Sequence, residues 1–238
     1  LINMKLIILA GGYGTRIGEE TKIKPKPLIK IGNKPIIWHI MKIYSHYGIK
    51  NFVICLGYKG ALLKKELNKI ITNENWNVKY VDTGLKTMTG GRIKRIKKFV
   101  NNEKYFFMTY GDGLCDININ KLIKFHIKKK KIATLTAVRY RNPKGVVTFD
   151  NHNKIKKIKE KPIEYINGGF YILDNKIFNY LKGDKTIFEK DSLSKLSKNK
   201  QLIGYRHKGF WACMDTTREK IELNKIWKSK AKAWKIWT

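Results

Sequence analysis

A short apolar run that ends in a glycine-rich loop is the feature that most constrains the fold of this chain. Residues 6–10, Leu-Ile-Ile-Leu-Ala, are aliphatic without alternation, which is typical of a strand buried on both faces of a parallel sheet. Gly11, Gly12 and Gly14 follow directly. Glycines at the carboxyl end of such a strand let backbone N–H groups approach an anion closely. The stretch therefore predicts an α/β fold with an anion-binding loop at one edge of a parallel sheet.

Cationic side chains follow the loop within a few residues. Thr15 adds a hydroxyl, and Arg16 adds a guanidinium whose forked donors suit phosphate. Lys26 lies in the segment 24–27, Lys-Pro-Lys-Pro, which predicts a stiff extended arm that presents ammonium groups. Together these residues indicate a binding site for a polyphosphate.

Two common phosphate-binding motifs do not fit the loop. The pattern G-x-G-x-x-G matches at Gly12 and Gly14 but fails at Ile17, and no Gly-Lys-Ser/Thr follows as a P-loop requires. What remains is L-A-G-G-x-G-T-R followed by K-P-K-P. This pattern resembles the signature of the sugar-nucleotide pyrophosphorylases, which are nucleotidyltransferases that act on sugar 1-phosphates.

Two carboxylates stand at the ends of predicted strands. Asp112 lies between two glycines after the aromatic-rich strand Tyr105–Tyr110, and Asp215 ends the segment 209–216. Ligands of α/β sheets bind at the carboxyl ends of strands. Because Mg²⁺ takes one or two carboxylates and completes its shell with water and phosphate oxygens, we predict that Asp112 and Asp215 hold Mg²⁺.

Two more segments have the character of ligand-binding turns. Residues 87–92 combine small residues and two glycines with an arginine at a helix start, although ordinary helix capping explains this pattern as well. Glu160 and Lys161 precede a proline, as Lys26 does, after a predicted hairpin in residues 145–158. We expect Lys161 to contact a sugar phosphate, and Glu160 and Asn167 to contact sugar hydroxyls beside Gly168.

Composition bears on partners and compartment. The formal charge is +33, but only seven of the 51 basic residues are arginine, and the lysines occur in every segment. Abundant Lys, Ile and Asn is typical of an AT-rich genome, whereas nucleic-acid binding is the alternative. We expect no nucleic-acid partner, and a field that attracts anionic substrates.

The chain shows no sign of a membrane span or a secretion signal. No apolar run approaches the roughly 20 residues of a span, and residues 6–10 are too short for the core of a signal peptide. Three widely spaced cysteines indicate thiols in a reducing compartment. We therefore expect a cytoplasmic protein with no membrane partner, starting at Met4, with residues 1–3 upstream of the domain.

Longer segments narrow the resemblance to the glucose-1-phosphate cytidylyltransferase family. The matching segments are residues 24–60, TYGDG, DTG, TGGR, EKP, NGGF, GFWACMDT and the WKIW tail. The family carries a longer insertion where this chain has residues 71–76. The resemblance implies a nucleotide-diphospho-sugar transferase fold, with a Rossmann-like, mostly parallel central sheet flanked by helices and a small β subregion on the sugar side. It also implies a single domain of residues 4–238, in which 4–132 mainly bind nucleotide and 133–238 mainly bind sugar phosphate.

The resemblance further implies an activity and its residues. CTP and α-D-glucose 1-phosphate would give CDP-glucose and pyrophosphate in a Mg²⁺-dependent reaction without a covalent intermediate. The enzyme would be a homo-oligomer. We also expect the aromatic tail, residues 233–237, to pack on the body or on a neighbouring subunit. UTP or dTTP as the nucleotide, or a non-catalytic nucleotide sensor, are the alternatives. Arg16, Lys26 and Asp112 would carry catalysis. The implied nucleotide-binding residues are Leu9, Ala10, Gly11, Gly12, Gly14, Thr15, Arg16, Lys26, Thr87, Arg92 and Gly111.

Overall fold

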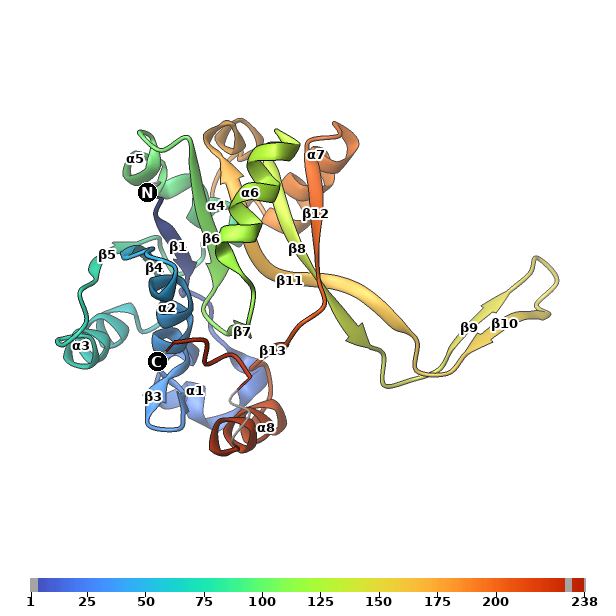
Figure 1. Cartoon of the computed structure of the whole chain (residues 1–238), viewed down its shortest axis with the longest axis horizontal. Helices are drawn as coiled ribbons and strands as arrows, with labels where there is room; N and C mark the ends of the chain where they lie inside the picture. Colours follow the sequence, from blue (N-terminus) through green and yellow to red (C-terminus); the bar gives the residue numbers. More distant parts are fainter. Residues whose placement is uncertain (1–3, 230–232, 238) are drawn as a thin grey trace.

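A seven-stranded sheet forms the centre of the protein (Figure 1). The computed structural model describes residues 4–229 and 233–237, so residues 1–3, expected to precede the domain, lie outside the described residues. In sheet order the strands are β12 (Leu202–His207), β8 (Ala133–Arg141), β11 (Ile163–Asp174), β6 (Tyr105–Tyr110), β1 (Leu6–Leu9), β4 (Asn51–Leu56) and β5 (Asn77–Asp82).

Neighbouring strands run parallel except at β11. Strand β1 pairs in parallel with β4 and β6, whereas β11 is antiparallel to both β6 and β8. All four residues of β1 are buried, as the unbroken aliphatic run predicted. The predicted Rossmann-like, mostly parallel sheet is confirmed.

Two hydrophobic cores lie on opposite faces of this sheet. Leu6 and Ile8 of β1 belong to one core, and Ile7 and Leu9 belong to the other, because successive side chains of a strand point to opposite faces. The helices of the first core are α2 (Ile36–His46), α3 (Gly60–Ile70), α6 (Ile119–Lys129) and α8 (Thr217–Lys228). Those of the second are α4 (Thr89–Arg95), α5 (Lys97–Val100), a 3₁₀ turn (Asn175–Tyr180), a π-helix (Phe188–Leu193) and α7 (Ser194–Lys198).

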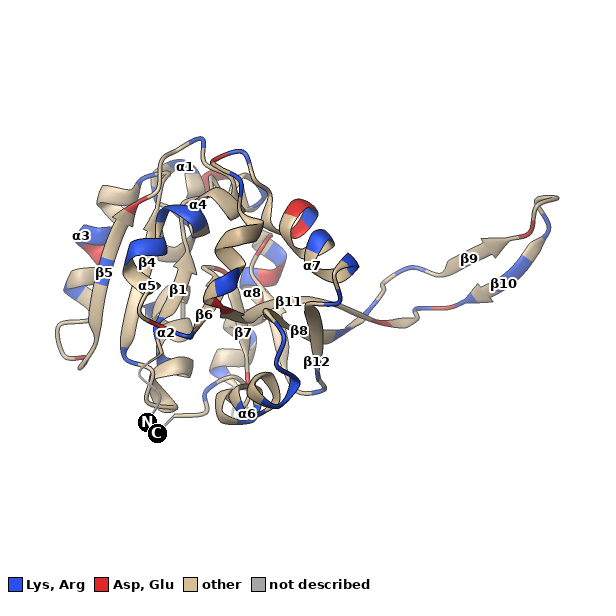
Figure 2. Ribbon diagram, turned by 90° about the horizontal axis from the view of Figure 1, so that it is seen from above, with Lys and Arg blue, Asp and Glu red and all other residues tan. Residues whose placement is uncertain are grey.

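A two-stranded ribbon, residues 141–163, projects from the body, and we call it the arm (Figures 1 and 2). Its strands β9 (Val146–Phe149) and β10 (Ile155–Lys159) pair antiparallel, which confirms the predicted hairpin. The carboxylate of Asp150 closes the turn by accepting from the backbone N–H groups of His152 and Lys154, at 2.8 and 3.0 Å. The arm continues the ends of β8 and β11 beyond the sheet.

Short elements connect the first strand to the second helix. They are the 3₁₀ turns Thr15–Ile17 and Lys26–Leu28, the helix α1 (Glu19–Ile23), and strands β2 (Lys30–Ile31) and β3 (Lys34–Pro35). Residues 24–27 were predicted to be extended, and this is wrong for Lys26 and Pro27, which lie in a 3₁₀ turn. Pro25 is extended, but its carbonyl accepts from the backbone N–H of Leu28 at 2.9 Å, which closes a turn at Lys26.

The C-terminal tail packs on the body of the same chain, one of the two predicted outcomes. Trp234 is fully buried in the first core and stacks on Phe210 and Trp227. Within the described residues, no helix combines the length and apolarity needed to cross a membrane.

Candidate active site

A pocket of about 490 Å³ opens where β1 and β6 end. Three segments line it: the loop after β1, the residues after β6, and the start of α4 with the turn before it. Every residue that the sequence placed at the nucleotide lines this pocket, namely Leu9, Ala10, Gly11, Gly12, Gly14, Thr15, Arg16, Lys26, Thr87, Arg92 and Gly111. Asp112 lines it as well.

The glycine loop has its shape for two physical reasons. Gly14 has φ of +69°, in the left-handed region where a side chain is strained. Gly11 lies against the guanidinium of Arg92, so that a Cβ there would collide with it. Gly12 has open space around it and faces no such limit. The loop can therefore present its backbone to a ligand only with glycine at positions 11 and 14.

Arg92 supports the glycine loop through hydrogen bonds. Its buried guanidinium donates to the carbonyls of Gly11 and Leu56 at 3.0 and 2.9 Å, and to the hydroxyl of Thr83 at 2.6 Å. Burial lowers the pKa of this guanidinium, although acceptors surround it. Arg92 thus lines the pocket, and its donors hold the ends of β1 and β4 together.

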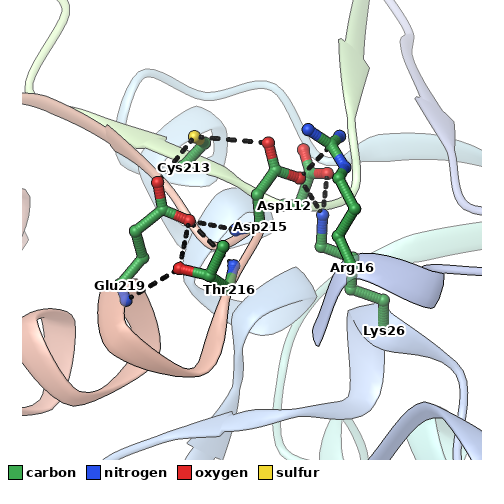
Figure 3. Close-up of polar contacts among 7 residues, drawn as sticks. All are labelled: Arg16, Lys26, Asp112, Cys213, Asp215, Thr216 and Glu219. Atoms are coloured by element: carbon green, nitrogen blue, oxygen red, sulfur yellow. Dashed lines mark hydrogen bonds and ion pairs between the residues drawn. The ribbon is translucent and has the colours of Figure 1, made fainter. Parts of the chain in front are cut away.

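Two cations and two carboxylates meet beside the pocket (Figure 3). The ammonium of Lys26 donates to Oδ2 of Asp112 at 2.6 Å and to Oδ1 of Asp215 at 2.5 Å. Arg16 Nη2 lies 2.9 Å from the same oxygen of Asp215. Burial disfavours the charged form of Lys26, but the two carboxylates outweigh burial and raise its pKa above the usual value. The four residues that the sequence predicted to share one site therefore lie together in the structure.

Strand pairing and a helix cap bring the two carboxylates together from distant parts of the chain. Strand β7 (Gly113–Cys115) pairs antiparallel with β13 (Trp211–Cys213), and the N–H of Met214 donates to the carbonyl of Asp112 at 2.9 Å. Glu219 in the first turn of α8 accepts from the backbone N–H of Asp215 at 2.7 Å, as part of a capping box with Thr216. Asp215 is therefore held at a fixed point before the helix.

The donor set fits a divalent cation. Asp112 and Asp215 each place one oxygen within hydrogen-bond distance of a single point, which Lys26 Nζ marks in this structure. Both carboxylates are partly exposed, so water or phosphate oxygens can complete a coordination shell. These residues can hold Mg²⁺ next to bound phosphates.

The structure does not bring Glu160 and Lys161 to this pocket. Both are exposed on the arm, between β10 and β11, and neither lines the pocket. The sequence argument relied on the likeness of this Lys-Pro pair to that at Lys26, but here the flanking residues pair into a projecting ribbon. Lys161, expected to contact a sugar phosphate, and Glu160, expected to contact sugar hydroxyls, therefore lie away from the residues that line the pocket.

Asn167 and Gly168 lie at the base of the arm. The Asn167 amide donates to the hydroxyl of Tyr171 at 2.5 Å, and its oxygen accepts from the N–H of Gly169. The carbonyl of Gly168 accepts from the indole of Trp211 at 2.8 Å. Asn167 is thus engaged with protein groups, and it lies within β11, the strand that borders β6.

One acidic residue beside the pocket was missed. Glu189 accepts from the hydroxyl of Tyr110 and from that of Thr89, the latter at 3.0 Å, and both partners line the pocket. Glu189 lies in the π-helix, a form that often marks functional sites. No local pattern in the sequence points to it, because its partners are about 80 and 100 positions away.

The chain is similar to known nucleotidyltransferases. A family model described as nucleotidyl transferase matches residues 5–227. The glucose-1-phosphate cytidylyltransferase of Salmonella typhimurium is 40% identical over 257 aligned residues, which cover 98% of this chain and 100% of the relative. The probable glucose-1-phosphate cytidylyltransferase of Bacillus subtilis is 40% identical over 256 residues, with the same coverage. These alignments are longer than the chain itself, so the relatives contain residues that this chain lacks.

A solved structure has the same fold. The crystal structure of HddC from Yersinia pseudotuberculosis superposes with a TM-score of 0.77 at 25% sequence identity, and the match covers 94% of this chain and 100% of that chain.

Proposed function

Since the chain belongs to the nucleotidyl transferase family, we propose that it transfers the cytidylyl group of CTP to α-D-glucose 1-phosphate, giving CDP-glucose and pyrophosphate. One observation carries the proposal: a single pocket combines a glycine loop, Arg16, Lys26 and Asp112, and a second carboxylate, Asp215, contacts Lys26 beside it. The choice of CTP and glucose 1-phosphate follows the two relatives that are 40% identical over their whole length. We place the reaction in the cytoplasm, where nucleoside triphosphates and sugar phosphates are made.

The reaction is a phosphoryl transfer that needs no nucleophile from the protein. A phosphate oxygen of glucose 1-phosphate attacks the α-phosphorus of CTP, a new P–O bond forms, and the bond to pyrophosphate breaks in line with it. The attacking oxygen is already an anion, so a strong base is unnecessary. The barrier comes from bringing two anions together and from charge on the leaving group, which positioned cations lower.

Each residue of the pocket has a role in this scheme. Backbone N–H groups of the glycine loop bind the triphosphate, Arg16 binds the departing pyrophosphate, and Lys26 stabilises the α-phosphoryl group. Asp112 and Asp215 would hold Mg²⁺, which would supply further positive charge to offset that of the phosphates. Thr87, just before α4, and Arg92, within α4, line the pocket and would border the nucleotide.

The acceptor side is assigned to the second half of the domain, residues 133–238, while residues 4–132 supply most of the nucleotide pocket. Asn167 and Gly168, at the base of the arm, are the acceptor residues nearest to the pocket strand β6. Glu160 and Lys161 would take part only with the arm turned toward the pocket, since they lie on its exposed portion here.

A panel of nucleoside triphosphates tests the proposed function. CTP, UTP, dTTP, GTP and ATP are each supplied with glucose 1-phosphate and Mg²⁺, and pyrophosphate release is measured. We expect CTP to give the highest kcat/KM. A preference for UTP or dTTP would reassign the base, and no release with any nucleotide would make the chain a non-catalytic nucleotide sensor.

We also propose that the protein is a homo-oligomer. The arm exposes large apolar side chains, with Phe149 59%, Ile155 57% and Ile158 62% accessible to solvent. A two-stranded ribbon has little stability in water by itself, so apolar side chains of this size favour contact with a second copy.

A further inference from the structure

The ammonium of Lys26 lies at the point where a metal ion held by Asp112 and Asp215 would lie. It contacts one oxygen of each carboxylate, at 2.6 and 2.5 Å, so the oxygens that would ligate an ion are already paired (Figure 3). Only 10% of the Lys26 side chain is exposed, which shields this contact from solvent. The glycine loop packs against the aliphatic part of the Lys26 side chain, since Gly14 lies beside its Cβ and Cδ.

The two carboxylates cannot hold both cations in this arrangement. Mg²⁺ binds carboxylate oxygens at about 2.1 Å, so an ammonium on the same two oxygens would lie in direct contact with the ion and repel it. Loss of Lys26 without a replacement would leave two adjacent carboxylates with like charge and, among the described residues, Arg16 as their one remaining ion-pair partner. The negative charge of the two carboxylates is therefore offset at this point by the lysine or by a metal ion, and not by both at once.

The ammonium group of Lys26 can turn to a second position inside the pocket. Its side chain lines the pocket that holds the anion-binding loop, and lysine has a flexible stem of four carbons. A triphosphate in this pocket supplies anionic oxygens to which the ammonium can turn. Arg16, whose side chain is 73% exposed, can follow in the same direction from Asp215.

We propose that Lys26 is a resident cation that keeps the metal site closed until a nucleoside triphosphate draws its ammonium away. The metal therefore enters with the nucleotide or after it. This inference rests on the proposed function, because it requires a triphosphate in the same pocket, and it adds an order of assembly.

Mn²⁺ binding without nucleotide tests the inference. Free Mn²⁺ is measured by electron paramagnetic resonance for the wild type, Lys26→Met and the matched control Lys24→Met. Lys24 has the same charge two positions away, but it pairs with Glu20 at 3.3 Å instead. We expect Lys26→Met to bind Mn²⁺ about tenfold or more tightly than the wild type, and Lys24→Met to stay within about twofold of it.

Two further comparisons keep the result decisive. Lys26→Gln, which keeps a hydrogen-bond donor without the charge, should show the same gain, and adding Asp112→Asn to Lys26→Met should remove it. In the wild type, Asp112→Asn alone should leave Mn²⁺ binding without nucleotide unchanged, because the site is closed. The inference is overturned if folded Lys26 variants bind no more tightly than the wild type, if the gain survives Asp112→Asn, or if Asp112→Asn alone weakens binding.

The outcome is separable from that of the nucleotide panel. An inactive panel together with tighter Mn²⁺ binding by Lys26→Met rejects the proposed function and retains the exchange of cations at this site. An active panel with unchanged Mn²⁺ binding rejects only the order of assembly.

Discussion

Two buried cations beside the pocket differ in their partners and hence in their roles. Arg92 donates to three backbone carbonyls and a hydroxyl, which are neutral groups of the scaffold. Lys26 donates to two carboxylates at the pocket edge. A cation held by neutral carbonyls has no alternative partner to exchange, whereas one held by carboxylates can be replaced by another cation. We therefore expect Arg92 to contribute chiefly to structure, and Lys26 to chemistry.

Replacing Lys26 should abolish most of the activity. In Lys26→Ala, the α-phosphoryl group loses a charge-assisted donor, and kcat should fall by roughly 10²-fold to 10³-fold. Pyrophosphate release measures the loss. Lys24→Ala, two positions away, should retain activity close to that of the wild type, and an active Lys26→Ala would remove Lys26 from the mechanism.

Replacing Arg92 should instead reduce stability. Arg92→Met leaves the carbonyl of Gly11 without its side-chain donor and removes the tie between β1 and β4, so the free energy of unfolding should fall by about 3 kcal/mol. Urea denaturation followed by circular dichroism measures this. Arg95→Met, which removes an exposed arginine paired with Asp184, should change stability little. Equal effects of the two variants would contradict the role of Arg92.

At the scale of elements, helix α2 and the C-terminal tail enclose a neutral histidine. His39 is fully buried; its Nε2 lies 2.9 Å from the carbonyl of Ile31, and its Nδ1 faces the indole N–H of Trp234. One nitrogen therefore donates and the other accepts, which only the neutral ring can do. Burial lowers the pKa of His39 to about 4.

This histidine should make the fold sensitive to acid. Its pKa is about 4 when folded and about 6.5 when unfolded, so the unfolded state takes up the proton first as pH falls. The stabilisation is complete above pH 6.5 and is lost between pH 6.5 and pH 4, by about 2 kcal/mol at pH 4.5. Urea denaturation at pH 7 and pH 4.5 measures the difference.

A matched pair of variants isolates the effect of His39. His39→Gln should lose less stability between these pH values than the wild type, because it cannot take up the proton. His46→Gln, on the exposed end of the same helix, should behave as the wild type does. If the two variants show the same pH dependence, His39 does not cause the acid sensitivity.

At the scale of the whole molecule, the arm is the part that the body does not cover. Figure 2 shows it extending away from the sheet, with basic residues spread over both arm and body. Large apolar side chains are exposed at several places on the body, but the arm gathers five of them in one short segment, namely Val147, Phe149, Ile155, Ile158 and Ile163. Self-association through the arm must overcome the repulsion between two chains of charge +33, which salt reduces.

Polar substitutions on the arm should shift the oligomer toward monomer. In Phe149→Ser/Ile158→Ser, the apolar contact with a second copy is lost, and the mass measured by light scattering should fall while the pocket is unchanged. Ile23→Ser, an exposed apolar side chain on the body at 76% accessibility, is the control. A wild type that is monomeric at all concentrations would contradict the proposed oligomer.

Local patterns in the amino-acid sequence are sufficient to predict part of the site. A buried aliphatic strand, the glycines after it, and carboxylates after later strands all follow from short-range preferences and from the rule that parallel strands end at one edge. For this reason the loop residues, Lys26 and Asp112 could be placed in one pocket without a structure.

The groups that these residues contact depend on how distant elements pack together. The position of Lys26 between Asp112 and Asp215 depends on the pairing of β7 with β13, and the link from Glu189 to Tyr110 depends on two elements 79 positions apart. The Lys-Pro pair at Lys161 matches that at Lys26 in sequence, yet it lies on a projecting ribbon because its flanking residues pair with each other. Contacts between distant segments arise from the packing of whole elements, and local sequence patterns do not predict that packing.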